Sequence, residues 1–417
     1  MAEIRKLDVF RGGELVGELT DDIPLKFTYA ESVLSHSKEP ISPAISLSQA
    51  EHSGSEVEVF FENLLPEAGV RELLKLKYQV STTFGLLTAI GGDTAGNLTL
   101  LPHGELPATP QYEKISWEEI AQSFRDPTRI LAPGKNEDGI RISLAGAQKK
   151  ISILVKLDGP YQPLGSSPST HILKPDIKGV EGVWSSAINE TFVMQLARSL
   201  KLGVADVEYE PTVRACLVKR YDRIVEDNGE IKRLHQLDLC QLDGKLSTVK
   251  YETDGGPSLS RCCHLLKENG VPASDLKRLV QWVFFNLFVG NNDSHAKNLS
   301  VYFMPDGGVK LTPFYDLLST SIYAGLSRKF AFKIGGENVP SEIGASHISK
   351  MAEELNFKPT YVMKIAEEIS VNILSNIDDT TAELMRGANF GSDQTMLERL
   401  NAYIRSNTVK LQRRILE

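Results

Sequence analysis

A polar turn between an apolar segment and a strand-like segment constrains this chain more than any other feature. The turn reads Gly-Asn-Asn-Asp-Ser-His-Ala-Lys-Asn over Gly290–Asn298 and follows the apolar, helix-like run 276–288. Asp293 and Asn298 belong to this turn, and Asp316 follows a strand-like segment a little further on. Carboxylate and amide oxygens are the ligands that Mg²⁺ prefers in proteins. The fold must therefore bring a helix end and a strand end together if these side chains are to share one site.

The order of these side chains is the order that protein kinases use for a catalytic Asp, a Mg²⁺-binding Asn and a second Mg²⁺-binding Asp. Phosphoryl transfer depends on positioning and charge neutralisation more than on covalent chemistry, so such groups suit it. We predict that Asp293 orients or deprotonates a hydroxyl group, and that Asn298 and Asp316 hold Mg²⁺. His295 would contact phosphate or orient Asp293. The alternative is a polar turn that caps a helix and carries a partly exposed histidine.

A second segment, Ser143–Lys150, reads Ser-Leu-Ala-Gly-Ala-Gln-Lys-Lys and lies between strand-like segments. Small residues let backbone N–H groups approach phosphate oxygens closely. The segment has one glycine, so it is neither a Walker A loop nor a G-x-G-x-x-G loop, and a simple hairpin turn is the alternative. The candidate phosphate-binding residues here are Ser143, Ala145, Gly146, Ala147, Gln148 and Lys150.

Two further segments fit the same chemistry. Lys174 ends an apolar strand-like segment just before a proline, and Glu190 lies on the helix-like segment that follows. In kinases, a strand lysine paired with a helix glutamate holds the α- and β-phosphates. Both could instead be ordinary surface residues. A later strand-like segment ends in Leu-Val-Lys-Arg-Tyr over Leu217–Tyr221. A nucleotide-binding hinge would lie here and contain Val218, Arg220 and Tyr221. The alternative is an ordinary strand edge.

Hydrophobic periodicity predicts the coarse organisation of the chain. A hairpin is expected around Gly12 and Gly13, and one helix over Phe60–Tyr78. Strands should dominate from about residue 140 to 270, and the last third should be mainly helical. Two of its predicted helices cover Ile348–Ile377 and the segment from Thr381 to the C-terminus.

Bulk composition excludes several classes of protein. The net charge of −8 argues against broad, non-specific binding to nucleic acid. The four cysteines include no C-x-x-C pair, which indicates a reducing compartment. The N-terminus has no apolar targeting segment, and no apolar run reaches the length that spans a bilayer. We therefore expect a cytoplasmic protein that does not contact a membrane, with two or three domains in its 417 residues.

Taken in order, these segments resemble the HipA family, the serine/threonine kinase toxins of bacterial type II toxin–antitoxin systems. The resemblance covers most of the chain, and the ordered set is more specific than any single motif. It rests on Val9–Gly13, Phe60–Pro66, Phe84–Leu87, Ser143–Lys150, Thr170–Pro175, Asn189–Glu190, Leu234–Gln236, Gly290–Asn298 and Tyr315–Leu317.

The resemblance implies an α+β, protein-kinase-like two-lobed fold with an added N-terminal α+β subdomain and a mostly helical C-terminal lobe. The expected domains are an N-terminal subdomain over 1–110, a strand-rich nucleotide-binding lobe over 111–225 and a helical catalytic lobe over 226–417. ATP and Mg²⁺ are the implied ligands. Asp293 matches the catalytic aspartate and Ser143 the autophosphorylated serine, whose modification switches the family's kinases off. Asn298 and Asp316 match metal ligands, whereas Lys174 and His295 match residues that contact phosphate.

The resemblance also implies a growth-arresting protein kinase. Its target in the family is a translation component, an aminoacyl-tRNA synthetase such as glutamyl-tRNA synthetase, and the result is a dormant, persistent state. The implied partner is a HipB-like helix-turn-helix antitoxin that binds operator DNA, so this acidic chain would reach DNA mainly through that complex. Two other classes remain open: a small-molecule kinase on a related fold, and a non-catalytic partner in a repressor complex.

Overall fold

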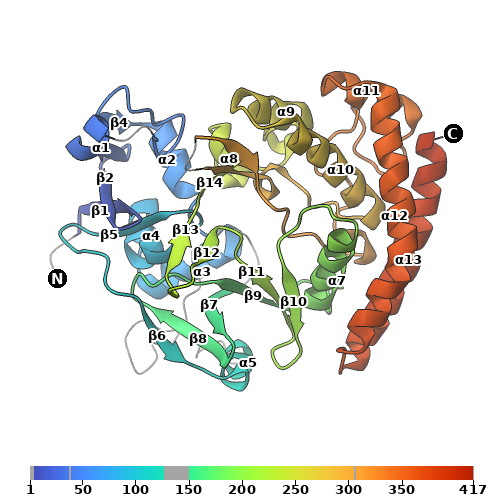
Figure 1. Ribbon diagram of the computed structural model, residues 1–417, viewed down its shortest axis with the longest axis horizontal. Coiled ribbons are helices and arrows are strands. Elements are labelled where there is room, and N and C mark those ends of the chain that lie inside the picture. The colour runs from blue at the N-terminus through green and yellow to red at the C-terminus, as the bar shows by residue number, and fades with distance from the viewer. Residues whose placement is uncertain (1–3, 37–38, 126–149, 305–306, 417) are drawn as a thin grey trace. The chain divides into compact units, whose positions relative to one another are not determined.

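The computed structural model describes residues 4–36, 39–125, 150–304 and 307–416. The chain divides into two compact units. The first contains the described residues up to Leu173 together with Asp222–Thr248, and the second contains Lys174–Tyr221 and the residues from Val249 onward. Figure 1 shows the elements of each unit. The three predicted domains, 1–110, 111–225 and 226–417, stay a prediction.

An antiparallel five-stranded sheet begins the first unit. Its strand order is β4-β3-β2-β1-β5. Gly12 and Gly13, with φ of 57° and 88°, form the two-residue turn between β1 and β2, a conformation that glycine adopts without steric cost. The predicted hairpin is therefore confirmed. The strands are β1 (Lys6–Arg11), β2 (Glu14–Thr20), β3 (Lys26–Tyr29), β4 (Glu51–Ser53) and β5 (Leu98–Pro102).

Among the described residues between β3 and β5 in the sequence, four segments are α-helices: α1 (Glu31–His36), α2 (Ser55–Glu62), α3 (Ala68–Tyr78) and α4 (Thr83–Ile90). The prediction of one helix over Phe60–Tyr78 was wrong, because the chain leaves the helix after Glu62 and begins another at Ala68. Pro66 lies in this break, where its ring and missing N–H oppose a continuous helix. Apolar periodicity continues on both sides of the break, which is why the pattern read as one helix.

The rest of the first unit consists of short strands and helices. β6 (Gln111–Lys114), β8 (Gly159–Leu164), β7 (Ile151–Lys156) and the start of β9 (His171–Pro175) pair antiparallel in this order. The buried guanidinium of Arg223 lies 2.8 Å from carboxylate oxygens of both Asp93 and Asp222, which ties the returning segment to the N-terminal one. The remaining elements are the 3₁₀ turn η1 (Gly91–Asp93), α5 (Trp117–Arg125), β12 (Arg223–Val225), β13 (Ile231–Arg233), β14 (His235–Asp238), α8 (Leu239–Leu242) and the start of the 3₁₀ turn η2 (Ser247–Val249).

Helices form most of the second unit. The long helices α12 (Pro359–Met385) and α13 (Gly391–Leu416) pack along each other, and α7 (Ser186–Ser199) and α10 (Ala273–Val289) pack against them (Figure 1). α9 (Leu259–Glu268) and α11 (Ala345–Glu354) complete the set of α-helices among the described residues of this unit. Two antiparallel strand pairs are found in the described part of this unit, β10 (Val207–Glu210) with β11 (Ala215–Lys219) and β15 (Ser300–Phe303) with β16 (Val309–Leu311).

The predicted break between the last two helices was misplaced. α12 continues through residues 377–381, because Ile377, Thr380 and Leu384 extend its buried face at helical spacing. The chain instead leaves the helix around Gly387, and α13 begins at Gly391. Thr381, where the last helix was predicted to begin, lies on this unbroken helix.

α10 forms the centre of the second unit and leads directly to the polar turn. Its side chains are buried almost all round, and they include Leu279, Val280, Trp282, Val283, Phe284, Phe285, Leu287 and Phe288. A helix buried on all sides is held by packing rather than by local propensity. Its end therefore provides a rigid base for the residues that follow.

Two predictions from composition concern the whole chain. The four cysteines all belong to described residues, and none of them forms a disulfide. None of the helices that the structure describes is long and apolar enough to cross a membrane.

Buried His235 makes the stability of the first unit depend on pH. Burial, reinforced by the positive charge of Arg11, lowers the pKa of His235 to about 3. Below about pH 6.5 the unfolded chain binds a proton here that the folded unit does not. The free energy of unfolding should therefore fall by up to about 1.4 kcal/mol for each pH unit as the pH drops from 6.5 towards 3. Denaturant unfolding at pH 7, 6 and 5 measures the free energy of unfolding at each pH. In His235→Gln this free energy should change less with pH than in the wild type. The control is His264→Gln, because His264 is exposed. The same pH dependence in the wild type and in both variants would contradict the role given to His235.

Candidate active site

Gly290 ends α10 and turns the chain into the Asp293 segment. Its φ is 72°, in the left-handed region that favours glycine. A Cβ atom at this position would lie 2.7 Å from the Tyr403 hydroxyl oxygen and 2.9 Å from the Cβ of Ser321. Both the backbone conformation and the space therefore require glycine, and the position of the turn depends on this residue.

Asparagine side chains hold the turn in one conformation. Asn291 accepts a hydrogen bond from the backbone N–H of Asp293 at 3.2 Å and donates one to Asn286 on α10 at 2.7 Å. Asn292 donates to the Ser321 hydroxyl at 2.9 Å and to the Ser327 carbonyl at 3.0 Å. Asn291 and Asn292 are buried, whereas Asp293 is exposed. The turn thus presents one carboxylate to solvent on a fixed backbone.

His295 is buried beside this carboxylate. Burial and the positive charge of Lys250 hold the pKa of His295 well below its ordinary value, so the imidazole is neutral at pH 7. Its Nδ1 atom finds no hydrogen-bond partner among the residues that the structure describes. The predicted alternative of a partly exposed turn histidine is wrong, because the side chain lies under the turn at 5 % exposure. A buried, neutral imidazole with a free ring nitrogen suits a ligand that brings its own donor or acceptor.

Tyr315 connects the segments that carry the two predicted metal ligands, Asn298 and Asp316. Its hydroxyl donates to the Lys297 carbonyl at 2.8 Å and lies 2.9 Å from the Ser300 hydroxyl. The residue before Asp316 is therefore fastened to the residue before Asn298. Asn298 is buried at the end of the 3₁₀ turn η4 (Ala296–Asn298), and Asp316 has a φ of 61° and a partly exposed side chain. Carboxylate and amide oxygens are ligands that Mg²⁺ takes, and the assignment of Asn298 and Asp316 as metal ligands stays a prediction.

Lys174 is a buried cation between two acids. Its ammonium nitrogen lies 2.6 Å from Glu190 on α7 and 2.8 Å from Asp316. Burial alone would lower its pKa, but the negative charges of Asp316 and Glu190 outweigh burial and raise it, so the lysine stays charged. The alternative of solvated surface residues does not hold, since Lys174 and Glu190 are both buried. The assignment of this pair to ATP phosphates stays a prediction.

The predicted hinge residues follow β11. Val218 pairs with Val207 on β10, and Arg220 is buried. The ring of Tyr221 lies 5.5 Å from that of Tyr315, and the Tyr221 carbonyl accepts a hydrogen bond from Tyr302 at 2.9 Å. These contacts connect the end of β11 to the Asp316 segment. A role in nucleotide binding stays a prediction for Val218, Arg220 and Tyr221.

Most of the predicted phosphate loop lies outside the described residues. This applies to Ser143, Ala145, Gly146, Ala147 and Gln148. Lys150, the last residue of that segment, is described and buried.

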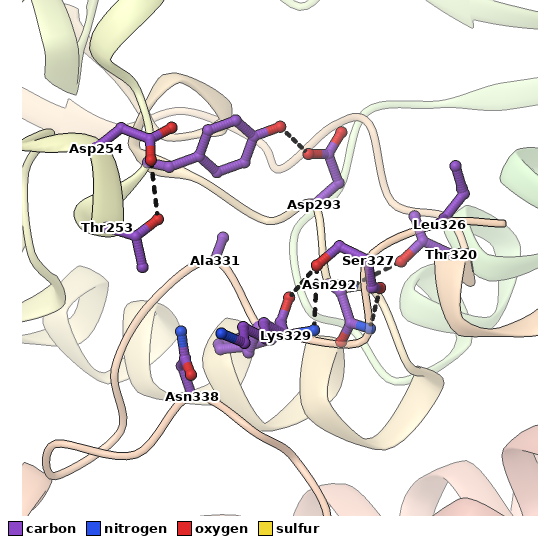
Figure 2. Close-up of a pocket in the computed structure, with 12 residues that line it drawn as sticks. Thr253, Asp254, Asn292, Asp293, Thr320, Leu326, Ser327, Lys329, Ala331 and Asn338 are labelled. Carbon is purple, nitrogen blue, oxygen red and sulfur yellow. Dashed lines mark hydrogen bonds between the residues drawn. The ribbon is translucent and has the colours of Figure 1, made fainter.

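Sequence reasoning missed Tyr251. Its hydroxyl donates a hydrogen bond to a carboxylate oxygen of Asp293, and its ring meets that of His295 edge-on with centroids 5.1 Å apart. It also lines a pocket of about 460 Å³ that includes Asp293 (Figure 2). Tyr251 lies 42 residues before Asp293. No motif or periodicity in that stretch distinguishes it from other tyrosines.

Known proteins share this fold over nearly the whole chain. The HipA N-terminal domain matches residues 7–101, and the HipA-like C-terminal domain matches residues 142–377. A Sinorhizobium fredii protein, named provisionally as the kinase Y4mE, is 36% identical over 91% of both chains. The serine/threonine-protein kinase toxin HipA of Shewanella oneidensis is 32% identical over 85% of this chain and 84% of its own. A solved structure of HipA with HipB and operator DNA from Shewanella oneidensis has a TM-score of 0.81 at 28% identity, covering 98% of this chain and 96% of that one.

These matches and the α+β fold define a kinase with an N-terminal sheet subdomain and a helical C-terminal region. The chain belongs to the HipA family. The predicted family, fold class and enzyme class are confirmed.

Gly290 offers a test of how the turn is held. Gly290→Ala should reduce the free energy of unfolding by about 2–5 kcal/mol, because a left-handed alanine costs about 1–2 kcal/mol and the overpacked Cβ adds about 1–3. Gly270 is the matched control, since its φ is 74° and no atom lies within 4 Å of a Cβ there. Gly270→Ala should reduce the free energy of unfolding by only the about 1–2 kcal/mol of the left-handed alanine. Denaturant unfolding measures both losses. An equal loss of unfolding free energy in the two variants would show that the close contacts at Gly290 do not destabilise the alanine variant.

Proposed function

We propose that this kinase transfers phosphate from ATP to serine or threonine residues of a protein, with Asp293 as the catalytic aspartate. The observation that carries the proposal is the exposed carboxylate of Asp293 on a turn whose neighbours are buried and hydrogen-bonded. A general base needs this geometry, because it must come within hydrogen-bond reach of the acceptor hydroxyl without moving away from it.

The surrounding side chains suit the remaining tasks. Asn298 and Asp316 would hold Mg²⁺, which supplies neutralising charge to the phosphates. Lys174, kept charged by Glu190 and Asp316, provides a second fixed positive charge. His295 is neutral, so it would contact a phosphate oxygen as a hydrogen-bond donor rather than as a cation. Ser143, Ala145, Gly146, Ala147, Gln148 and Lys150 would form the phosphate loop, and Val218, Arg220 and Tyr221 the hinge.

We further propose that the chain is the toxin of a type II toxin–antitoxin pair in the cytoplasm. Support comes from the Shewanella oneidensis relative, which is named as a kinase toxin, and from the solved complex of HipA with HipB and operator DNA. The proposed partner is a HipB-like helix-turn-helix antitoxin that binds operator DNA. The proposed target is an aminoacyl-tRNA synthetase such as glutamyl-tRNA synthetase, whose phosphorylation would arrest growth and promote persistence.

Autophosphorylation of Ser143 is the proposed off-switch. A phosphate adds about −1.5 to −2 charges, which would repel bound ATP phosphates and disfavour the closed loop. The resemblance to the HipA family supports this assignment.

Removing either acid should abolish the reaction. Asp293→Ala should lower Mg·ATP-dependent phosphate incorporation at Ser143 by about 100- to 10,000-fold, because general-base catalysis contributes a factor of this size. Asp316→Ala should abolish metal-dependent turnover. Tryptic mass spectrometry before and after incubation with Mg·ATP measures both effects in protein that starts unmodified. Asp379→Ala, on the exposed face of α12, is the control.

The same variants test the toxin role in cells. Expression of the wild-type chain without antitoxin should arrest growth, and Asp293→Ala should not. Metabolite phosphorylation without Ser143 modification would support a small-molecule kinase instead. Toxicity that persists in Asp293→Ala would support a non-catalytic partner.

A further inference from the structure

A histidine and two carboxylates meet on one face of the N-terminal sheet. Strand β1 lies between β2 and β5 in this sheet (Figure 1). Asp8 on β1 is the direct cross-strand partner of Glu18 on β2, so these two side chains share a face. His103 follows the last residue of β5, and its ring reaches the same two acids. One ligand atom from each of the three side chains lies within 4.8 Å of the other two.

The two acids share a single nitrogen atom of the histidine. Nδ1 of His103 lies 2.9 Å from Oδ1 of Asp8 and 3.3 Å from Oε2 of Glu18. An imidazole nitrogen carries at most one proton, so its hydrogen bond can be well directed to only one of these oxygens. Like charges that lie directly opposite each other in a sheet also destabilise the strand pair. A divalent cation between the three atoms would remove both conflicts.

The second oxygen of each acid already has a partner. Oδ2 of Asp8 accepts a hydrogen bond from the backbone N–H of Gly104 at 2.9 Å, and Oε1 of Glu18 accepts one from the Lys6 ammonium group at 2.7 Å. Such outer contacts orient the carboxylates that bind metal ions in proteins. Asp8 is buried, whereas the His103 side chain is 60 % exposed, so the three atoms can be reached from solvent.

The distances and the ligand types fit zinc. Zn²⁺ binds histidine nitrogen at about 2.0–2.1 Å and carboxylate oxygen at about 2.0–2.2 Å, so two of its ligand atoms lie about 2.9–3.5 Å apart in octahedral or tetrahedral coordination. The two distances from Nδ1 of His103, 2.9 and 3.3 Å, lie in this range. Mg²⁺ and Ca²⁺ prefer oxygen ligands alone, whereas an imidazole suits first-row transition metals.

We propose that Asp8, Glu18 and His103 form a binding site for a divalent transition metal, with Zn²⁺ as the ion that best fits the ligand set. The ion binds one atom of each side chain and completes its coordination with water. It links β1, β2 and the residue after β5, so its binding stabilises the folded sheet. The site is separate from the residues assigned to ATP and Mg²⁺, and the inference does not rest on the proposed function.

Calorimetric titration of the chelator-treated full chain with ZnCl₂, without nucleotide, tests the site. The wild type should bind one equivalent of Zn²⁺ that His103→Gln and Glu18→Gln do not bind. Each variant should weaken this binding by about 100-fold or more, because outer contacts alone contribute about 10- to 100-fold to metal affinity. Zn²⁺ should also raise the melting temperature of the wild type, and it should raise that of the two variants less.

The matched control is His264→Gln, since His264 lies 3.1 Å from a single carboxylate, that of Glu268, and should bind no ion of its own. Unchanged melting temperatures of the metal-free variants establish that they are folded, and Glu18→Gln serves if His103→Gln is not. If the wild type binds no Zn²⁺, the cluster is an ion pair only and the proposal is overturned. Zn²⁺ binding that persists in both variants lies elsewhere and overturns it too. Equally tight binding of Mg²⁺ or Ca²⁺, insensitive to His103→Gln, would show a non-specific acidic surface.

Discussion

The candidate site depends on the ion pairs that the buried ammonium group of Lys174 forms with Glu190 and Asp316. Removing a charge from water is costly, and it is tolerated here because Glu190 and Asp316 each lie within 2.8 Å. The contact joins the end of β9, helix α7 and the Asp316 segment in one electrostatic unit. Loss of either acid would leave a buried charge partly uncompensated, so the positions of these three elements are energetically coupled.

The Asp293 turn fixes the position of an exposed side chain. Its side chain is exposed, so the carboxylate is not withdrawn from water. Its backbone, however, is tied to buried asparagines and to a glycine with no room for a side chain. Rigidity therefore comes from the residues around Asp293, whose carboxylate accepts a hydrogen bond from the hydroxyl of Tyr251.

Sequence reasoning succeeded where one local pattern carried the information. The hairpin at Gly12 and Gly13 followed from turn chemistry, and the family followed from an ordered set of motifs. It failed where apolar periodicity continued across a break, as at Pro66, and where a boundary between two helices was predicted inside α12. At Pro66 the proline itself opposed the helix that the apolar pattern suggested. In α12 the buried face decided the boundary, and burial depends on contacts with distant segments.

The sequence by itself predicted a chemistry for the candidate site, from the residue types and their order at Asp293, Asn298 and Asp316. It also indicated that Lys174 and Glu190 belong to the same site. Only the tertiary structure decided that His295 is neutral, that Lys174 remains charged, and that Tyr251 contacts Asp293. The physical reason is that protonation and hydrogen bonding depend on burial and on groups far away in the sequence, which no local pattern encodes.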